Sequence, residues 1–247
     1  MENSTGRRAG PWRAIALLAA VALVAALWWA PASTRQGVNF QVRTVQIPLA
    51  VKAMDFLVRD WKYRSAAAEI TAGRRSSDEK ILAIYEWTRE HIRRQPQDWP
   101  VIDDHILHIM IRGYGISDQM ADVFTTLCAY AGVPAYWRLV RVSPDKGALV
   151  LSFARAERGW ITLDLSNGVI FRDASGALVP AAALPQNQEM VTRVIGDRRI
   201  DSVPYADYLN AVGDVTPPSP MRSELQMPGR RLLYELRRLV GFGRVMG

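Results

Sequence analysis

The stretch Arg112–Val133, RGYGISDQMADVFTTLCAYAGV, decides the fold of this 247-residue chain. Gly113 and Gly115 indicate a tight turn, and the residues that follow have a helical period. The apolar positions recur every three or four residues and are Met120, Ala121, Phe124, Leu127, Cys128 and Ala131. We therefore predict a core helix with Ser117 at its N-terminus, where free amides and the helix dipole favour the anionic form of a nucleophile.

Strand-like segments follow this helix, which Gly132-Val133-Pro134 ends. They are Ala135–Val142, Ala148–Ala154, Trp160–Leu165 and Gly168–Arg172, separated by turn-forming residues. Such short connections predict an antiparallel sheet. We expect its apolar faces to pack against the Ser117 helix, in an α+β fold whose helices precede its strands.

Two motifs in this region resemble a known family. Gly-Tyr-Gly-Ile-Ser-Asp-Gln-x-Ala at 113–121, followed by a helix and Ala-Gly-Val-Pro-Ala at 131–135, resembles the nucleophile segment of the bacterial transglutaminase-like (papain-type, Cys-His-Asp) family. Gly159–Asp164 resembles the family's Gly-x-Trp-x-x-x-Asp segment. The resemblance implies a cysteine-proteinase-type fold over residues 76–185, with helices packed on an antiparallel sheet.

The same resemblance implies substitutions at two of the three catalytic positions. Ser117 stands where the family has its cysteine, and Asp164 falls on the acid of the triad. The histidine position, eleven residues before Trp160, falls on Leu149, and no histidine follows His108. A serine hydroxyl without a base is a weak nucleophile at neutral pH.

Asp164 also has a second interpretation. An aspartate at the end of a strand often caps the following turn, here toward Asn167. A remnant of the triad and a turn cap are both compatible with the sequence.

Asp103, Asp104, His105 and His108 form a polar cluster. Histidines three residues apart could share a helix face and bind a metal ion. We favour a short helix that turns Ile106, Leu107, Ile109 and Met110 inward, so we expect no metal and no cofactor. In a third alternative, His105 or His108 replaces the missing base beside Ser117.

Cys128 is the single cysteine of the chain, so an intrachain disulfide is excluded. Its place on the apolar face of the helix predicts a small core residue. It lies eleven residues, or about 16 Å of helix rise, beyond Ser117 and cannot act in its place.

The N-terminus predicts a membrane segment. Arg7, Arg8 and Arg13 precede the uncharged run 14–30, AIALLAAVALVAALWWA. A cleaved signal peptide and a transmembrane anchor are both possible, and we favour the anchor because of its length and its terminal tryptophans. The arginines predict a cytoplasmic N-terminus and a periplasmic domain.

The remaining segments complete the predicted organisation. A basic N-terminus (1–13) and the anchor (14–30) precede a stalk at 31–75, with a strand or an extended segment over 38–47 that Pro48 ends and a helix over 49–71. The transglutaminase-like domain (76–185) opens with a capping box at Ser76–Glu79. A C-terminal extension (186–215), with helices on either side of Gly196-Asp197, precedes a linker and a basic amphipathic helix (216–247).

That last helix has two interpretations. Its apolar side comprises Leu232, Leu236, Leu239 and Val240, and its basic side Arg230, Arg231, Arg237 and Arg238. It could lie on a membrane surface or dock on a partner, or it could pack on its own domain.

The sequence as a whole predicts a membrane-anchored envelope protein. The net charge is +7, but no nucleic-acid-reading motif accompanies it, so we expect a membrane and an envelope protein or glycan as partners. The leading hypothesis is a catalytically inactive transglutaminase-like domain that serves as a binding or scaffolding module at the envelope. One form of this hypothesis is a role in envelope or polysaccharide assembly. The alternative is a Ser117-dependent hydrolase or acyltransferase acting on peptide or amide substrates.

Overall fold

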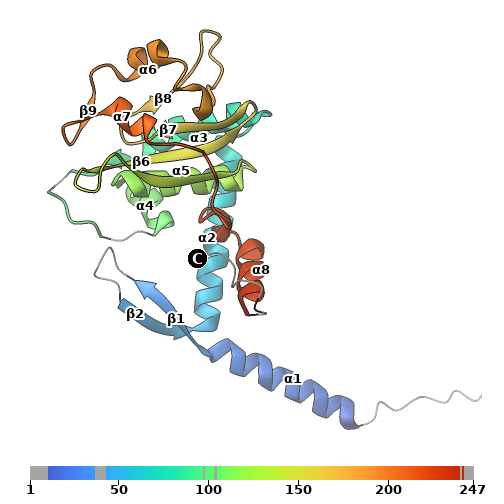
Figure 1. Ribbon diagram of the computed structural model, residues 1–247. Helices are drawn as coiled ribbons and strands as arrows, with labels where there is room; N and C mark the ends of the chain where they lie inside the picture. The colour runs from blue at the N-terminus through green and yellow to red at the C-terminus, as the bar shows by residue number, and fades with distance from the viewer. Residues whose placement is uncertain (1–10, 37–42, 97, 103–104, 240, 242–247) are drawn as a thin grey trace, which may run out of the picture. The chain divides into compact units, whose positions relative to one another are not determined.

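The structure is a computed structural model that describes residues 11–36, 43–96, 98–102, 105–239 and 241 (Figure 1). The chain divides into two compact units, Met1–Val58 and Arg59–Gly247, and the boundary lies within one helix. Arg7, Arg8, Asp103, Asp104 and Val240, which were named above, lie outside the described residues.

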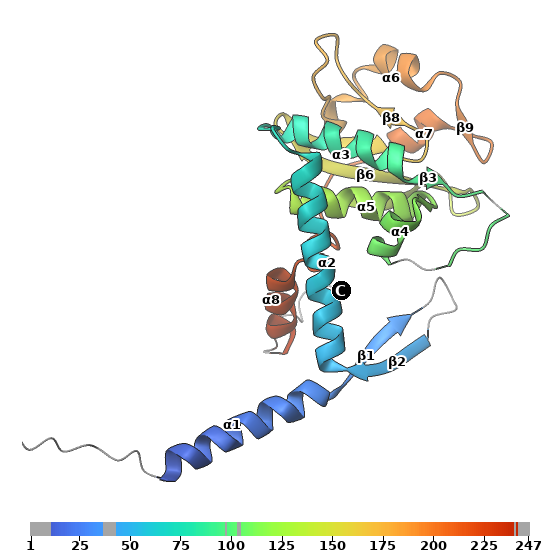
Figure 2. The same cartoon turned by 180° about the vertical axis from the view of Figure 1, so that it is seen from behind.

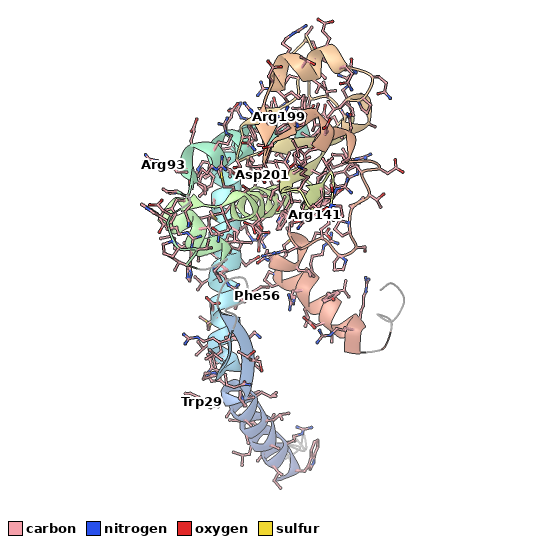
Figure 3. All side chains as sticks on the ribbon, turned by 60° about the vertical axis from the view of Figure 1, so that its left-hand side comes forward. Trp29, Phe56, Arg93, Arg141, Arg199 and Asp201 are labelled. Carbon is pink, nitrogen blue, oxygen red and sulfur yellow. The ribbon has the colours of Figure 1, made fainter. Side chains whose placement is uncertain are left out.

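The first unit begins with an apolar helix, α1 (Pro11–Trp29). Among the described residues, it is the one helix long and apolar enough to cross a membrane, over Trp12–Trp29. Its side chains are exposed from Trp12 to Trp29, and Trp29 at its end is 72% exposed (Figure 3). A helix that is apolar on every side is typical of a buried or membrane-spanning segment.

An antiparallel hairpin follows α1. It pairs β1 (Pro31–Gln36) with β2 (Arg43–Pro48), and Pro48 ends the second strand as predicted. The first strand was not predicted, and residues 38–42 of the predicted strand lie outside the described part. The backbone N–H of Leu49 donates to Ala30 O at 2.8 Å, which joins the start of the next helix to the end of α1.

The second unit contains most of α2 (Leu49–Ile70), then α3 (Ser77–His91), α4 (Ile106–Arg112) and α5 (Ser117–Tyr130). The predicted capping box opens α3. Glu79 N donates to Ser76 Oγ at 3.1 Å, and Ser76 N donates to Glu79 Oε2 at 3.0 Å. The backbone N–H groups of Ser76 and Arg75 lower the pKa of Glu79, because they favour its charged form.

The predicted antiparallel sheet is present. Its order is β5 (Ala135–Arg141), β6 (Ala148–Ala156), β7 (Gly159–Asp164) and β8 (Val169–Ile170). Short pairs stand beside it: β3 (Arg93–Arg94) runs parallel to β4 (Tyr114–Gly115), and β9 (Arg199–Ile200) pairs with β10 (Val203–Pro204). The connections of the sheet are short, the longest covering residues 142–147, which is why consecutive strands are neighbours.

Helices cover both faces of the sheet (Figures 1 and 2). On one face, residues such as Ala154 and Leu163 join a core with α3, α4 and α5. On the other, Leu151 and Phe153 join a second core with α6 (Gln188–Ile195) and α7 (Tyr205–Asn210). The second core is a departure from the prediction, which packed the sheet against the Ser117 helix alone.

An ion pair and two hydrogen bonds hold the C-terminal segment on the domain before the last helix begins. After η1 (Ala181–Ala183), α6 and α7, the chain passes η2 (Glu224–Gln226) and ends in α8 (Pro228–Leu239). The Arg222 guanidinium lies 2.8 Å from an Asp122 carboxylate oxygen. Ser223 Oγ donates to Ala135 O, and Tyr130 OH donates to Gln226 O at 2.9 Å.

Cys128 is fully buried on α5, and burial raises the pKa of its thiol well above the ordinary value. We predict that Cys128→Ala lowers the free energy of unfolding by about 1 kcal/mol, because it removes one packed sulfur atom. Chemical denaturation of both proteins measures the difference. Native wild-type protein should also resist a thiol reagent until it unfolds, and rapid labelling of the folded protein would contradict this burial.

Candidate functional site

The glycine turn before α5 is shaped by two close approaches. Gly113 ends α4 in the left-handed region, with φ of 71°, and a Cβ there would lie 3.2 Å from His91 O. A Cβ on Gly115 would lie 3.0 Å from Gln119 Oε1. That buried amide oxygen accepts hydrogen bonds from Arg112 Nη2 at 2.7 Å and from Ile116 N at 3.2 Å. The motif therefore places Gln119 under the turn, where it satisfies a free amide at the start of α5.

Ser117 is the first residue of α5, as predicted, and is partly buried. Its hydroxyl donates to Ser166 Oγ at 3.3 Å, which is longer than a strong hydroxyl–hydroxyl hydrogen bond. Ser166 belongs to the turn after β7, so this contact brings the start of α5 beside the predicted acid position. A second hydroxyl is not a general base at neutral pH, so it does not activate Ser117.

Asp164 ends β7 and is 1% exposed. Its Oδ1 accepts a hydrogen bond from Asn167 N at 2.9 Å. Its Oδ2 accepts from Asn167 Nδ2 at 2.7 Å and from Tyr205 OH at 2.9 Å. The predicted turn cap toward Asn167 is therefore confirmed, and Tyr205 is a further partner that the sequence did not indicate.

Tyrosines surround the Asp164 carboxylate. Burial, followed by the Asp164 charge, raises the pKa of Tyr205 far above its ordinary value. Burial also raises the pKa of Tyr85 on α3, although the neighbouring Arg89 opposes this shift. Both phenols therefore stay protonated at neutral pH, and Tyr205 is a hydrogen-bond donor to the carboxylate.

Arginines lie at the outer edge of this cluster. Arg198 Nη1 donates to Asn167 O at 2.9 Å, and its guanidinium lies 6.0 Å from the Tyr205 ring centre. The Arg89 guanidinium lies 5.7 Å from the Tyr85 ring centre. It packs so closely on Gly168 that a Cβ at this glycine would lie 2.6 Å from it. The turn that Asp164 caps is thus contacted by Arg89 from α3 and by Arg198 from the C-terminal extension.

Leu149 is the second residue of β6 and is 5% exposed. Ser152 pairs with Leu163 of β7, so continuing the register by one pair places Leu151 opposite Asp164. Leu149, two residues earlier, shares that face of the sheet. Both leucines belong to the second core, together with Tyr205.

All three histidines of the chain lie in the described part. His91 stacks on Trp87, with ring centres 4.4 Å apart. The rings of His105 and His108 lie 4.6 Å apart at the start of α4, whose Ile106 and Ile109 are buried as the short-helix interpretation predicts. Among the described residues, the hydrogen bond of the Ser117 hydroxyl goes to Ser166 and not to an imidazole.

Metal-binding side chains do not gather in the described part of the chain: it contains no group of three or more His, Cys, Asp or Glu residues that could hold an ion. The polar group that contacts Ser117 is instead the Ser166 hydroxyl, in the turn that follows Asp164.

Comparison with known families identifies this domain. Residues 64–165 match the family described as the transglutaminase-like superfamily. The chain therefore carries a transglutaminase-like domain, and the predicted family and fold are confirmed. The match ends directly after Asp164, and it starts in α2 rather than at the predicted residue 76.

Comparison with solved structures gives weaker likenesses. A proposed protease from Parabacteroides distasonis is 13% identical, with a TM-score of 0.37, over 55% of this chain and 36% of its own. A proposed cysteine protease from Cytophaga hutchinsonii is 16% identical, with a TM-score of 0.38, over 50% of this chain and 45% of its own. A protein described as a TGase is 14% identical, with a TM-score of 0.34, over 62% of this chain and 50% of its own.

The chain thus spans half or less of each of these solved structures. Among curated proteins, none matches it. The catalytic assignment of Ser117 and Asp164, with Leu149 at the base position, stays a prediction.

Tyr205 provides a test of the Asp164 cluster. We predict that Tyr205→Phe lowers the free energy of unfolding by roughly 1.5–3 kcal/mol at pH 7, because it removes a hydrogen bond to a buried charge. The folded-state pKa of Tyr205 is raised, so its contribution is complete below the ordinary pKa of about 10 and is lost as the pH rises above it.

Urea unfolding at pH 8 and pH 11 measures both effects. Wild type should lose more stability than Tyr205→Phe between these values, with Tyr234→Phe on α8 as the matched control. Equal alkaline losses in wild type and Tyr205→Phe would contradict the assignment.

Proposed function

We propose that this chain is a membrane-anchored protein of the bacterial cell envelope whose transglutaminase-like domain has lost catalysis and binds or scaffolds other envelope components. The anchor is α1, with the N-terminus in the cytoplasm and the domain in the periplasm. The partner is an envelope protein or glycan, and a role in polysaccharide assembly is one form of this function.

The observation that carries the proposal is the state of the Asp164 carboxylate. Both of its oxygens already accept hydrogen bonds, from Asn167 and from Tyr205. In a catalytic triad, the acid orients and stabilises the imidazole of the base. Here both carboxylate oxygens already hold structural donors, and the hydrogen bond of Ser117 within the described part of the chain goes to a hydroxyl and not to an imidazole.

The nucleophile position supports the same conclusion. Ser117 has the helix N-terminus that would stabilise an anion, but the hydrogen-bond partner of its hydroxyl among the described residues is another hydroxyl. Removing the proton from a serine needs a base within hydrogen-bond reach. The runner-up is a hydrolase or acyltransferase that uses Ser117, and the partial exposure of this residue at the start of α5 is the feature that favours it.

The decisive test is Ser117→Ala. We predict that the variant keeps the cellular role of the protein, measured by complementation of a deletion strain, and loses at most about 1 kcal/mol of stability. Ser65→Ala, at an exposed position on α2, is the matched control. Ammonia release or acyl transfer from glutamine peptides should be absent in all three proteins. A wild-type activity that Ser117→Ala abolishes would establish the serine enzyme instead.

Ser117→Cys extends this test. We expect the single variant to stay inactive, because a thiol without a base lacks a proton donor for the leaving group. Ser117→Cys with Leu149→His is the smallest change that could rebuild the triad, and Leu151→His tests the position opposite Asp164. The single variant with full activity would show that a base is already present.

Membrane attachment has its own test. We predict that the chain stays with membranes after a high-salt wash, and that protease added outside spheroplasts digests the domain. The apolar length of α1 and the arginines before it motivate both expectations. A mature N-terminus at Ser33 in the soluble fraction would show that the segment is cleaved.

A further inference from the structure

The last helix, α8, exposes an apolar strip. Leu232, Leu233 and Leu236 are 62%, 45% and 48% exposed. Successive residues turn by about 100° around a helix, so these leucines fall within roughly 100° of one another. A narrow apolar strip on an otherwise polar helix is typical of segments that lie in the plane of a membrane surface.

The opposite side of α8 is strongly basic. It carries four arginines, Arg230, Arg231, Arg237 and Arg238, against a single acidic residue, Glu235, so its net charge is +3. Glu235 lies 2.8 Å from Arg231 and 3.3 Å from Arg238. Arg230 reaches Glu224 at a longer 3.7 Å, and Arg230 and Arg237 both border the edge of the strip at Leu233. The charge of α8 is therefore complementary to an anionic surface.

The segment before α8 limits how the helix can move. Arg222 forms an ion pair with Asp122, and Ser223 and Gln226 form hydrogen bonds with Ala135 and Tyr130, respectively. The chain is therefore held on the domain until two residues before α8 begins. The linker 216–220 therefore does not leave α8 on a long flexible tether. The helix thus stays close to the domain, with its three leucines about half exposed.

We propose that α8 binds an anionic lipid surface, with its leucines between the lipid chains and its arginines among the headgroups. This inference assumes the membrane attachment proposed above but does not depend on whether the domain is inactive. Charge complementarity favours lipid over a second copy of the chain, because two basic helices repel each other. One whole side of the 12-residue helix α8 also measures only about 18 Å by 10 Å, far below the roughly 800 Å² per partner of a stable interface.

The single buried cysteine makes a direct test possible. In the full chain, Leu236→Cys is labelled with an environment-sensitive dye, while Cys128 stays unlabelled because it is buried. The protein is placed in nanodiscs of phosphatidylcholine, alone or mixed with phosphatidylglycerol. We expect a blue shift and quenching by brominated lipid in the anionic discs only, both weakened by salt. The same dye at Arg193→Cys on α6 should show neither change.

Charge variants make the test quantitative. Each arginine near an anionic surface favours binding by about fivefold, so Arg230→Gln with Arg237→Gln should lower the ratio of bound to free α8 roughly 25-fold. Arg74→Gln with Arg75→Gln, in the exposed turn before α3, removes the same charge and should leave the ratio unchanged.

Three outcomes would overturn the inference. An equal blue shift in zwitterionic and anionic discs without quenching by brominated lipid would mean that protein covers the strip, from a second copy or from another part of this chain, and equal quenching in both discs would mean that the headgroup charge is not recognised. An unshielded dye in both discs would mean that α8 stays in water. In each case the chain would still be held in the disc by α1, whereas failure of the anchor would leave the discs without protein.

Discussion

The burial of α5 is the constraint on which the rest of the domain depends. Every residue from Gln119 to Ala129 is buried, so this helix has no solvent face and must be covered on all sides. Its polar residues then need internal partners. The Asp122 carboxylate accepts a hydrogen bond from Trp137 Nε1 at 2.6 Å and forms an ion pair with Arg222 at 2.8 Å. These two contacts connect α5 to β5 and to the C-terminal segment.

The same reasoning explains why the C-terminal extension belongs to the domain. A buried carboxylate is costly unless donors surround it, and the turn after β7 supplies only part of the donors that Asp164 needs. Tyr205 supplies the remaining hydrogen bond from α7. The extension also covers the second face of the sheet, where Phe153 is fully buried. The family match ends at residue 165, but the core continues beyond it.

Local patterns predicted the elements well. The capping box at Ser76, the helix from Ser117 and the antiparallel strands all depend on residues close together in the chain, so their signals are visible in the sequence. The cap from Asp164 to Asn167 is local too, and it was one of the two interpretations given. The hairpin strand Pro31–Gln36 was missed because its pairing with β2 has no signal in its own composition.

Contacts between distant segments could not be predicted in this way. Tyr205 lies 41 residues after Asp164, in a stretch without a clear pattern, and Ser166 lies 49 residues after Ser117. Neither pair has a spacing rule that would identify it. The second core was missed for the same reason, because short helices such as α6 and α7 reveal little about the sheet face that they cover.

These contacts also give the three triad positions different structural importance. Asp164 makes three hydrogen bonds in a buried site, so removing it would leave Tyr205 and Asn167 without their acceptor. Ser117 makes one long bond, and Leu149 contributes only apolar packing. Asp164, the one triad position that the fold needs, is therefore also the one that keeps the residue type of the family motif. The aspartate is accounted for by its hydrogen bonds, and its presence does not by itself indicate catalysis.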